Sequence, residues 1–292
     1  EVGQVIGHRQ AQCYGHRGQS RNGSSGSVPG SPKSEMLGPM PATQDDHQLA
    51  ADLAEEAGHL LVKLRNRLAA EDTPPAVLKA EGDRQAHEFL MERLLAARPG
   101  DAILSEEGKD DLVRLGAERT WIVDPLDGTR EFSEVPRSDW AVHVALVENN
   151  RPIAGAVALP ALGMVLSTAS AHVLDPNPAS PPRMIVSRSR PPAAAVHVAE
   201  AMGADLVQMG SAGAKAMAVV RGECEIYAHS GGQYEWDSCA PVAVAAAAGC
   251  HVSRIDGSEL LYNQEDVYLP DLLICRPELA AAALEALASF EG

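Results

Sequence analysis

Two aspartates three residues apart, Asp124 and Asp127, follow the apolar run that begins at Trp121 in this 292-residue chain. The β-branched pair in that run is typical of a buried strand, and Pro125 predicts that the strand ends there, because proline cannot continue a hydrogen-bonded ladder. Gly128 tolerates the turn that follows. Two carboxylates brought so close are unfavourable unless a cation lies between them, and hard oxygen ligands suit Mg²⁺. The stretch therefore predicts a magnesium site, with an ordinary Asp-containing loop as the alternative.

Other acidic residues stand where predicted elements begin or end. Glu106 and Glu107 follow a predicted strand over residues 102–105, and Asp237 begins an Ala-rich helix. Asp83 lies at the start of the second predicted helix. A solvated turn or a helix cap is the alternative reading for each of these acids. Thr129 follows the aspartate turn, and a carboxylate bonded to its hydroxyl could orient and deprotonate a water molecule.

Small and basic residues supply candidates for phosphate binding. The segment 210–215, Gly-Ser-Ala-Gly-Ala-Lys, lies between a predicted strand and a predicted helix, where backbone N–H groups can approach an anion. The segment 187–190, Ser-Arg-Ser-Arg, adds positive charge in an acidic protein. His143 alternates within an apolar strand, and we interpret it as a core or sheet-face histidine rather than a ligand.

Composition divides the chain into a tail and two predicted domains. Residues 1–42 are rich in Gly, Ser, Pro, Gln and Arg and predict a disordered tail. Residues 43–175 predict an α+β metal-binding domain, whose first helix begins with a capping box of Thr43 and Asp46. The Pro-rich segment 176–182 predicts a linker, and βα alternation over residues 183–292 predicts an α/β substrate-binding domain.

The net charge of −16 argues against an extended nucleic-acid surface, so the expected partner is a small phosphorylated molecule. No apolar run is long enough to predict a membrane span or a signal peptide. The five cysteines are widely spaced and lack a C-x-x-C pair, which favours a reducing cytoplasm. Oligomeric state is left open, with a homodimer as one option.

Three blocks in this order, residues 105–107, 121–129 and 236–237, resemble the inositol monophosphatase superfamily of Mg²⁺-dependent, lithium-sensitive phosphatases. The resemblance covers residues 43–292. The segments 212–215, 235–241 and 262–264 are most similar to its CysQ-type branch, the 3'(2'),5'-bisphosphate nucleotidases. The resemblance implies an α/β fold layered as an α-β-α-β-α sandwich.

The resemblance also implies roles for individual residues. The ligands of two or three Mg²⁺ ions would be Glu106, Asp124, Asp127, Asp237 and the carbonyl of Leu126. Asp83 and Thr129 would form the water-activating pair. Substrate contacts would come from Ser187, Arg190, Ser211, Lys215, Gly128, Thr129 and the metal ligands Glu106, Leu126, Asp127 and Asp237. Many relatives have histidine where Arg190 stands.

The function implied is hydrolysis of the 3'-phosphate of 3'-phosphoadenosine 5'-phosphate, or of its sulfated form, in sulfate assimilation. Inositol monophosphatase or fructose-1,6-bisphosphatase activity with the same metals is the near alternative. A non-catalytic metal- or nucleotide-binding protein is the alternative of another class, although pure binding would not need the Asp83–Thr129 pair.

Overall fold

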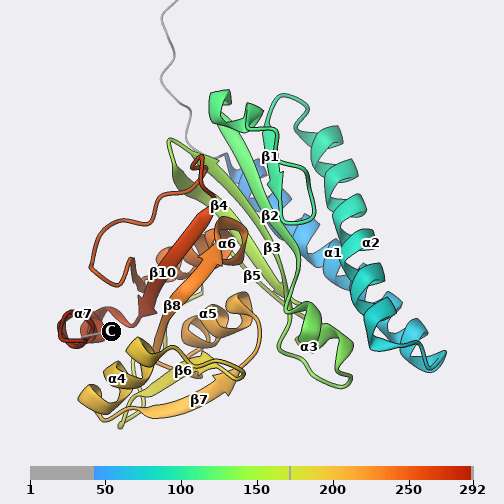
Figure 1. Cartoon of the computed structure of the whole chain (residues 1–292). Helices are drawn as coiled ribbons and strands as arrows, with labels where there is room; N and C mark the ends of the chain where they lie inside the picture. The colour runs from blue at the N-terminus through green and yellow to red at the C-terminus, as the bar shows by residue number, and fades with distance from the viewer. Residues whose placement is uncertain (1–42, 171, 291–292) are drawn as a thin grey trace, which may run out of the picture. The chain divides into compact units, whose positions relative to one another are not determined.

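The computed structural model describes residues 43–170 and 172–290, which build alternating layers of helix and sheet in the order α-β-α-β-α (Figure 1). The predicted tail over residues 1–42 lies outside the described residues. The layered arrangement confirms the predicted fold class.

The first sheet has the strand order β1-β2-β3-β4-β5. Its strands are β1 (Ala102–Ser105), β2 (Arg119–Asp127), β3 (Ala141–Glu148), β4 (Arg151–Leu159) and β5 (Met164–Ser167). β1 pairs with β2 in parallel, and the remaining pairs are antiparallel. β2, which carries Asp124 and Asp127, is therefore flanked on both sides.

The second sheet has the order β7-β6-β8-β10-β9. Its strands are β6 (Arg183–Ser187), β7 (Asp205–Met209), β8 (Ile226–Tyr234), β9 (His251–Ser253) and β10 (Tyr268–Cys275). β6 runs parallel to β7 and β8, whereas β10 is antiparallel to β8 and β9. This sheet is mixed, because βα alternation is followed by a strand that returns antiparallel to β8.

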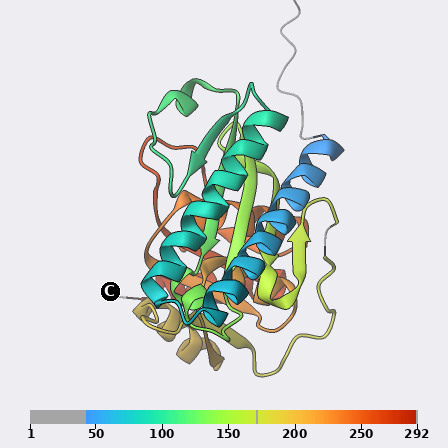
Figure 2. The ribbon, with the colours of Figure 1, turned by 90° about the vertical axis from the view of Figure 1, so that its right-hand side faces the viewer.

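Helices cover both faces of each sheet. α1 (Gln44–Ala70) and α2 (Pro75–Ala97) run side by side across the outer face of the first sheet (Figure 2). α5 (Ala212–Val220) and α6 (Glu235–Ala247) lie between the sheets, and α4 (Ala193–Met202) and α7 (Ala280–Ala288) cover the second sheet. The short elements are α3 (Thr129–Ser133) and the 3₁₀ turns η1 (Val113–Gly116), η2 (Pro160–Leu162) and η3 (Pro277–Leu279).

Alternating side chains of the strands build separate cores on the two faces of each sheet. In β2, Trp121 and Val123 belong to the core under α1 and α2, whereas Ile122 belongs to the core around α5 and α6. In β6, Met184 faces the core under α4 and α7, and Ile185 faces the core around α5 and α6. Both sheets thus share the central core. The division into two domains at the 176–182 linker stays a prediction.

The start of α1 confirms the predicted capping box. The backbone N–H of Asp46 donates to the Thr43 hydroxyl at 3.2 Å, and the N–H of Thr43 donates to the Asp46 carboxylate at 3.0 Å. These bonds satisfy N–H groups that the helix itself leaves unpaired.

The predicted start of the second helix was wrong. α2 begins at Pro75, so Asp83 lies inside the helix and does not cap it. Proline is tolerated at the first helical position because its missing N–H has no intrahelical acceptor there. Gly82 is buried, and a Cβ atom added to it would lie 2.7 Å from Leu126 and 2.8 Å from Phe132. Glycine therefore lets α2 approach the end of β2 and α3, and this approach positions Asp83.

The predicted end of the strand that carries Asp124 was also wrong. β2 continues through Pro125 to Asp127, and its register with β3 shifts between Asp124 and Asp127. The residue without an N–H group falls in this irregular stretch, where ladder bonds are interrupted. The irregularity falls between the two aspartates, which pair with His143 and Ala141 of β3.

One later boundary also differs from the predictions. α6 begins at Glu235 instead of Asp237, directly after β8 ends at Tyr234. Asp237 is consequently the third residue of α6 rather than its cap, although its carboxylate accepts the N–H of Tyr234 at 2.6 Å.

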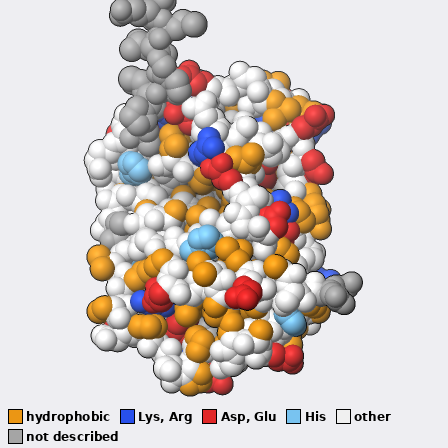
Figure 3. Space-filling model, turned by 90° about the vertical axis from the view of Figure 1, so that its left-hand side faces the viewer, with side chains coloured by type: hydrophobic (Ala, Val, Ile, Leu, Met, Phe, Trp, Pro, Cys, Tyr) orange, Lys and Arg blue, Asp and Glu red, His pale blue; other side chains and the backbone are white. Residues whose placement is uncertain are grey.

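One further face of the molecule shows several basic side chains lying beside acidic ones, with apolar side chains between them (Figure 3). Within residues 43–170 and 172–290, no helix combines the length and the apolarity needed to cross a membrane.

Candidate active site

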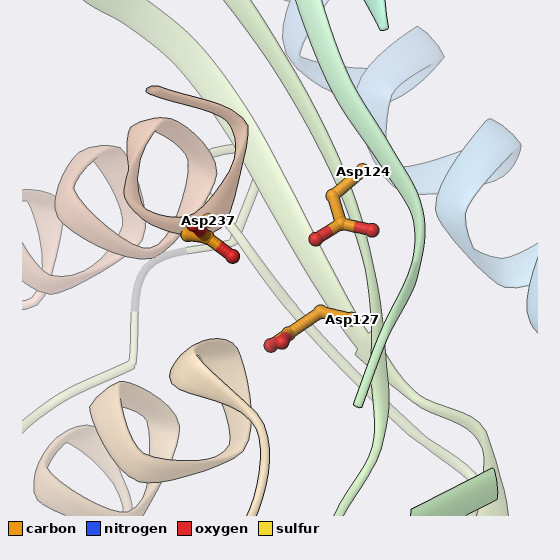
Figure 4. A group of neighbouring side chains, drawn as sticks. All are labelled: Asp124, Asp127 and Asp237. Atoms are coloured by element: carbon orange, nitrogen blue, oxygen red, sulfur yellow. The ribbon is translucent and has the colours of Figure 1, made fainter. Parts of the chain in front are cut away.

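Three carboxylates converge where β2 ends and α6 begins. Asp124, Asp127 and Asp237 each offer an oxygen atom, and these atoms lie within 4.8 Å of one another. Figure 4 shows that the three side chains face a common space between β2 and the start of α6. This set contains only oxygen donors, which is the chemistry that Mg²⁺ and similar hard cations prefer. The residues present therefore fit a divalent metal ion.

Burial and mutual repulsion disfavour ionisation of two of these groups, Asp124 and Asp237. The pKa of Asp124 is raised well above its usual value by burial and then by the charges of Glu106, Asp127 and Asp237. Burial followed by the charge of Asp127 raises the pKa of Asp237 to about 6. A cation held between the carboxylates would remove this repulsion and favour their ionised forms.

Glu106 lies at the rim of the cluster formed by Asp124, Asp127 and Asp237. Its backbone N–H donates to the Val123 carbonyl at 3.4 Å, which holds it beside β2. Its side chain is exposed and is not one of the three convergent carboxylates. Its pKa is nevertheless raised to about 7, by partial loss of solvent and by the charges of Asp237 and Asp127. Glu106 is therefore electrostatically part of the site.

Asp127 differs from its neighbours because donors from α5 surround it. It accepts the Ser211 hydroxyl, the N–H of Ala212 at 3.1 Å and the N–H of Gly213 at 2.7 Å. Burial alone would raise its pKa, but His143, Lys215 and Ser211 outweigh burial and hold it at about 2. Asp127 stays ionised and ties β2 to the N-terminus of α5, where the helix dipole favours an anion.

Asp83 supplies a further carboxyl group, which lies beside the three convergent aspartates without belonging to them. The Thr129 hydroxyl lies 3.1 Å from Asp83 Oδ1 and 3.1 Å from the Leu126 carbonyl oxygen. Burial raises the pKa of Asp83 to about 6, an effect that the Thr129 hydrogen bond partly offsets. A carboxyl group with a pKa near neutrality is suited to accept a proton. The structure thus brings together Asp83 and Thr129, as the sequence predicted.

Comparison with known proteins agrees with this geometry. The sequence profile of the inositol monophosphatase family matches residues 44–289. The chain belongs to this family. It is an enzyme of the hydrolase class, and the family is metal-dependent, in keeping with the convergent carboxylates.

Named relatives span most of the chain. A protein of Mycobacterium bovis named 3'-phosphoadenosine 5'-phosphate phosphatase is 51% identical over 241 residues, covering 80% of this chain and 90% of the relative. The 3'(2'),5'-bisphosphate nucleotidase CysQ of Escherichia coli is 30% identical over 234 residues, covering 74% and 94%. The crystal structure of CysQ from Bacteroides thetaiotaomicron superposes with a TM-score of 0.66 at 27% identity, covering 80% and 97%. The resemblance to CysQ proteins is therefore confirmed in both sequence and fold.

The two basic residues predicted to contact substrate differ in their surroundings. Lys215 is buried, and its Nζ donates to the Ser211 carbonyl at 2.5 Å and to the Gly210 carbonyl at 3.5 Å. Burial lowers its pKa, against the attraction of Asp127 and other acids. Arg190 is exposed, and its backbone N–H lies 3.5 Å from the Ser187 hydroxyl. Of the two, only Arg190 has its side chain open to an incoming ligand.

Arg188, which follows Ser187, forms ion pairs with two glutamates. Its guanidinium group donates to Glu131 at 2.7 Å and to Glu134 at 2.8 Å. The two glutamates follow the aspartate turn, so this ion-pair cluster ties the 187–190 segment to α3. Sequence reasoning missed it, because nothing local in the chain signals a contact across more than fifty positions.

His143 is the second residue whose contacts the sequence did not reveal. The interpretation as a core or sheet-face histidine is confirmed, because it lies in β3 and is fully buried. Its Nε2 lies 3.2 Å from Asp127 Oδ2, and its Nδ1 lies 3.0 Å from the Trp236 carbonyl oxygen. The register of β2 with β3, which pairs Asp124 with His143, is the signal that would have found it.

Aromatic rings gather beside Asp237 in a chain with few aromatic residues. The Tyr234 and Trp236 rings stack with centroids 4.9 Å apart and planes 13° apart. Tyr268 packs edge-on against Tyr234 at 6.1 Å. Tyr234 is exposed and Trp236 is half-buried, whereas Trp121 and Trp140 are fully buried.

Proposed function

We propose that the chain is a Mg²⁺-dependent phosphatase that removes the 3'-phosphate of 3'-phosphoadenosine 5'-phosphate, giving AMP and phosphate. It would likewise convert the sulfated form to adenylyl sulfate. The observation that carries this proposal is the convergence, at one end of β2, of three carboxylates and a separate carboxyl–hydroxyl pair. The first fits a hard cation and the second can accept a proton, and phosphate-ester hydrolysis needs both. The names of the mycobacterial and CysQ relatives support the nucleotide substrate.

Asp124, Asp127 and Asp237 would hold the metal, with Glu106 and the Leu126 carbonyl at the edge of the same space. When bound, Mg²⁺ supplies positive charge for the phosphate oxygens and acidity for the attacking water. Asp127 is already ionised, because donors from α5 and His143 stabilise its charge.

Asp83 and Thr129 would handle the proton. With its single hydroxyl hydrogen directed to Asp83 rather than to the Leu126 carbonyl, Thr129 would have its oxygen free to accept a hydrogen from water. As the water oxygen bonds to phosphorus, its proton passes to Thr129 while the Thr129 proton passes to Asp83. The bond from phosphorus to the 3'-oxygen breaks, and this oxygen takes a proton from solvent. The raised pKa of Asp83, about 6, matches this role at neutral pH.

The proposal extends to a cytoplasmic role in sulfate assimilation, with a small phosphorylated nucleotide as the partner. Four cysteines in the described part of the chain are free and buried, which supports a reducing compartment. The oligomeric state stays open, with a homodimer as one option.

Phosphate release measured side by side on three substrates tests the proposal. We expect release from 3'-phosphoadenosine 5'-phosphate to exceed release from inositol monophosphate and from fructose 1,6-bisphosphate, and to stop when EDTA removes the metal. A preference for inositol or sugar phosphate would reassign the substrate. Turnover that survives EDTA would remove the metal from the mechanism.

A further inference from the structure

His143 contacts β2, α5 and α6, the three elements that meet at the cluster of three aspartates. It lies on β3 directly opposite Asp124 of β2, so both side chains project from the same face of the sheet. Its imidazole ring reaches Asp127 on one side and the start of α6 on the other. The ring is fully buried, so these contacts are not shared with solvent.

The contact with α6 is made to the residue next to a carboxylate. Nδ1 lies 3.0 Å from the Trp236 carbonyl oxygen, and because a carbonyl only accepts, Nδ1 must donate. Trp236 precedes Asp237, so this bond fixes the backbone that carries the third carboxylate. Nε2 is therefore left to face Asp127 Oδ2 at 3.2 Å, and it has no aligned hydrogen bond to any residue in the described ranges.

The contact with α5 is a steric one. A Cβ atom added to Gly213 would lie 2.0 Å from Nε2, and real Cβ atoms do not approach so closely. Gly213 also donates its N–H to Asp127 at 2.7 Å. The ring thus fills the space that glycine leaves at the start of α5, and the two residues determine each other's position.

We infer that His143 is a positioning residue that sets the separation between Asp127 of β2 and Asp237 of α6, with Gly213 making room for its ring. Asp127 ends β2 and Asp237 lies in the first turn of α6, and the two residues are far apart in sequence. A single rigid imidazole links them, because it is bonded through Nδ1 to the start of α6 and lies against Asp127 through Nε2. This inference rests on the proposed function, because separation of the carboxylates matters most when they share a metal ion.

Residues that hold metal ligands in place typically contribute about 10–100-fold to metal affinity. The test is therefore Mg²⁺ binding without substrate, measured by isothermal titration calorimetry. His143→Asn keeps an amide donor near the Nδ1 position but is too short to reach Asp127. Gly213→Ala leaves the ring intact and pushes it with one methyl group. We expect each variant to raise the dissociation constant for Mg²⁺ by about tenfold or more.

The double variant His143→Asn/Gly213→Ala separates positioning from a general loss of packing. Without the ring, the added methyl group has nothing to displace, so the double variant should bind Mg²⁺ as His143→Asn alone does. Losses that multiply instead would mean that Gly213 and His143 act independently, and would overturn the inference. Double-mutant cycles measure this coupling directly.

Melting temperatures in EDTA show whether each variant is folded at the temperature of the titration. If His143→Asn does not fold, Gly213→Ala still decides. His229→Asn, which removes a half-buried histidine of β8, is the matched control and should leave the Mg²⁺ dissociation constant within twofold of wild type. A folded Gly213→Ala variant with wild-type affinity refutes the inference while the proposed function stands. A wild-type protein that binds no Mg²⁺ refutes both.

Discussion

Replacing Asp83 by asparagine should make the protein more stable and much less active. Burial raises the pKa of this carboxyl group from 3.8 to about 6. Since one pKa unit corresponds to about 1.36 kcal/mol, the ionised Asp83 costs the folded state at most about 3 kcal/mol at neutral pH. Asparagine removes that cost and keeps an oxygen that can accept the Thr129 hydroxyl. It cannot take a proton, so kcat should fall by about 10²–10⁴-fold.

The pH dependence gives the sign of the effect. The folded chain binds the Asp83 proton more tightly than the unfolded chain does, so ionisation of this group costs stability as pH rises from about 4 to about 6. The stability gap between Asp83→Asn and wild type should be absent below about pH 4, open between these values and stay constant above about pH 6.

Denaturant unfolding in EDTA at several pH values measures the gap, and phosphate release at saturating substrate measures kcat. Glu88→Gln on the exposed side of α2 makes the same carboxyl-to-amide change and should leave both quantities near wild type. The reasoning fails if Asp83→Asn is less stable than wild type at pH 7. It also fails if the variant keeps more than about a tenth of kcat, a barrier change of only about 1.4 kcal/mol.

Four further outcomes are expected. Asp237→Asn should fold but keep less than about a tenth of kcat, because α6 contributes this one carboxylate to the group; higher residual turnover would exclude it as a metal ligand. Li⁺ should inhibit phosphate release at concentrations where Na⁺ does not, since a small cation can replace Mg²⁺ among oxygen ligands, and indifference across Mg²⁺ concentrations would contradict this. Arg190→Ala should raise KM for 3'-phosphoadenosine 5'-phosphate more than for inositol monophosphate, because its side chain is exposed. Lys215→Ala, which removes a buried ammonium group, should lower activity on both substrates and lower the melting temperature; loss confined to the nucleotide would instead assign Lys215 to substrate binding.

The residues that carry local signals were predictable. Asp124, Asp127 and Thr129 belong to one short stretch, and the capping box at Thr43 is a short-range hydrogen-bond pattern. Asp83 was predicted as a participant but was placed in the wrong part of its helix. The helix begins at Pro75 rather than at Asp83, because proline is accepted in the first turn.

What could not be predicted depends on contacts between distant segments. The place of His143 follows from the register of β3 against β2 and from the approach of α5, neither of which any short stretch specifies. The same is true of Lys215. The glycine-rich segment that contains it suggested a phosphate contact, but the packing of α5 between the sheets buries Lys215 against backbone carbonyls.

The stacked pair of Tyr234 and Trp236 makes the site observable by tryptophan fluorescence. Two of the three tryptophans, Trp121 and Trp140, are shielded from solvent in the apolar interior. Trp236 is partly open to solvent and adjoins Asp237, and its carbonyl oxygen accepts a hydrogen bond from His143 Nδ1. Changes in emission or in accessibility to a soluble quencher should therefore report on this one indole. The fluorescence of an unlabelled sample would then follow metal binding to the three aspartates in real time, with or without turnover.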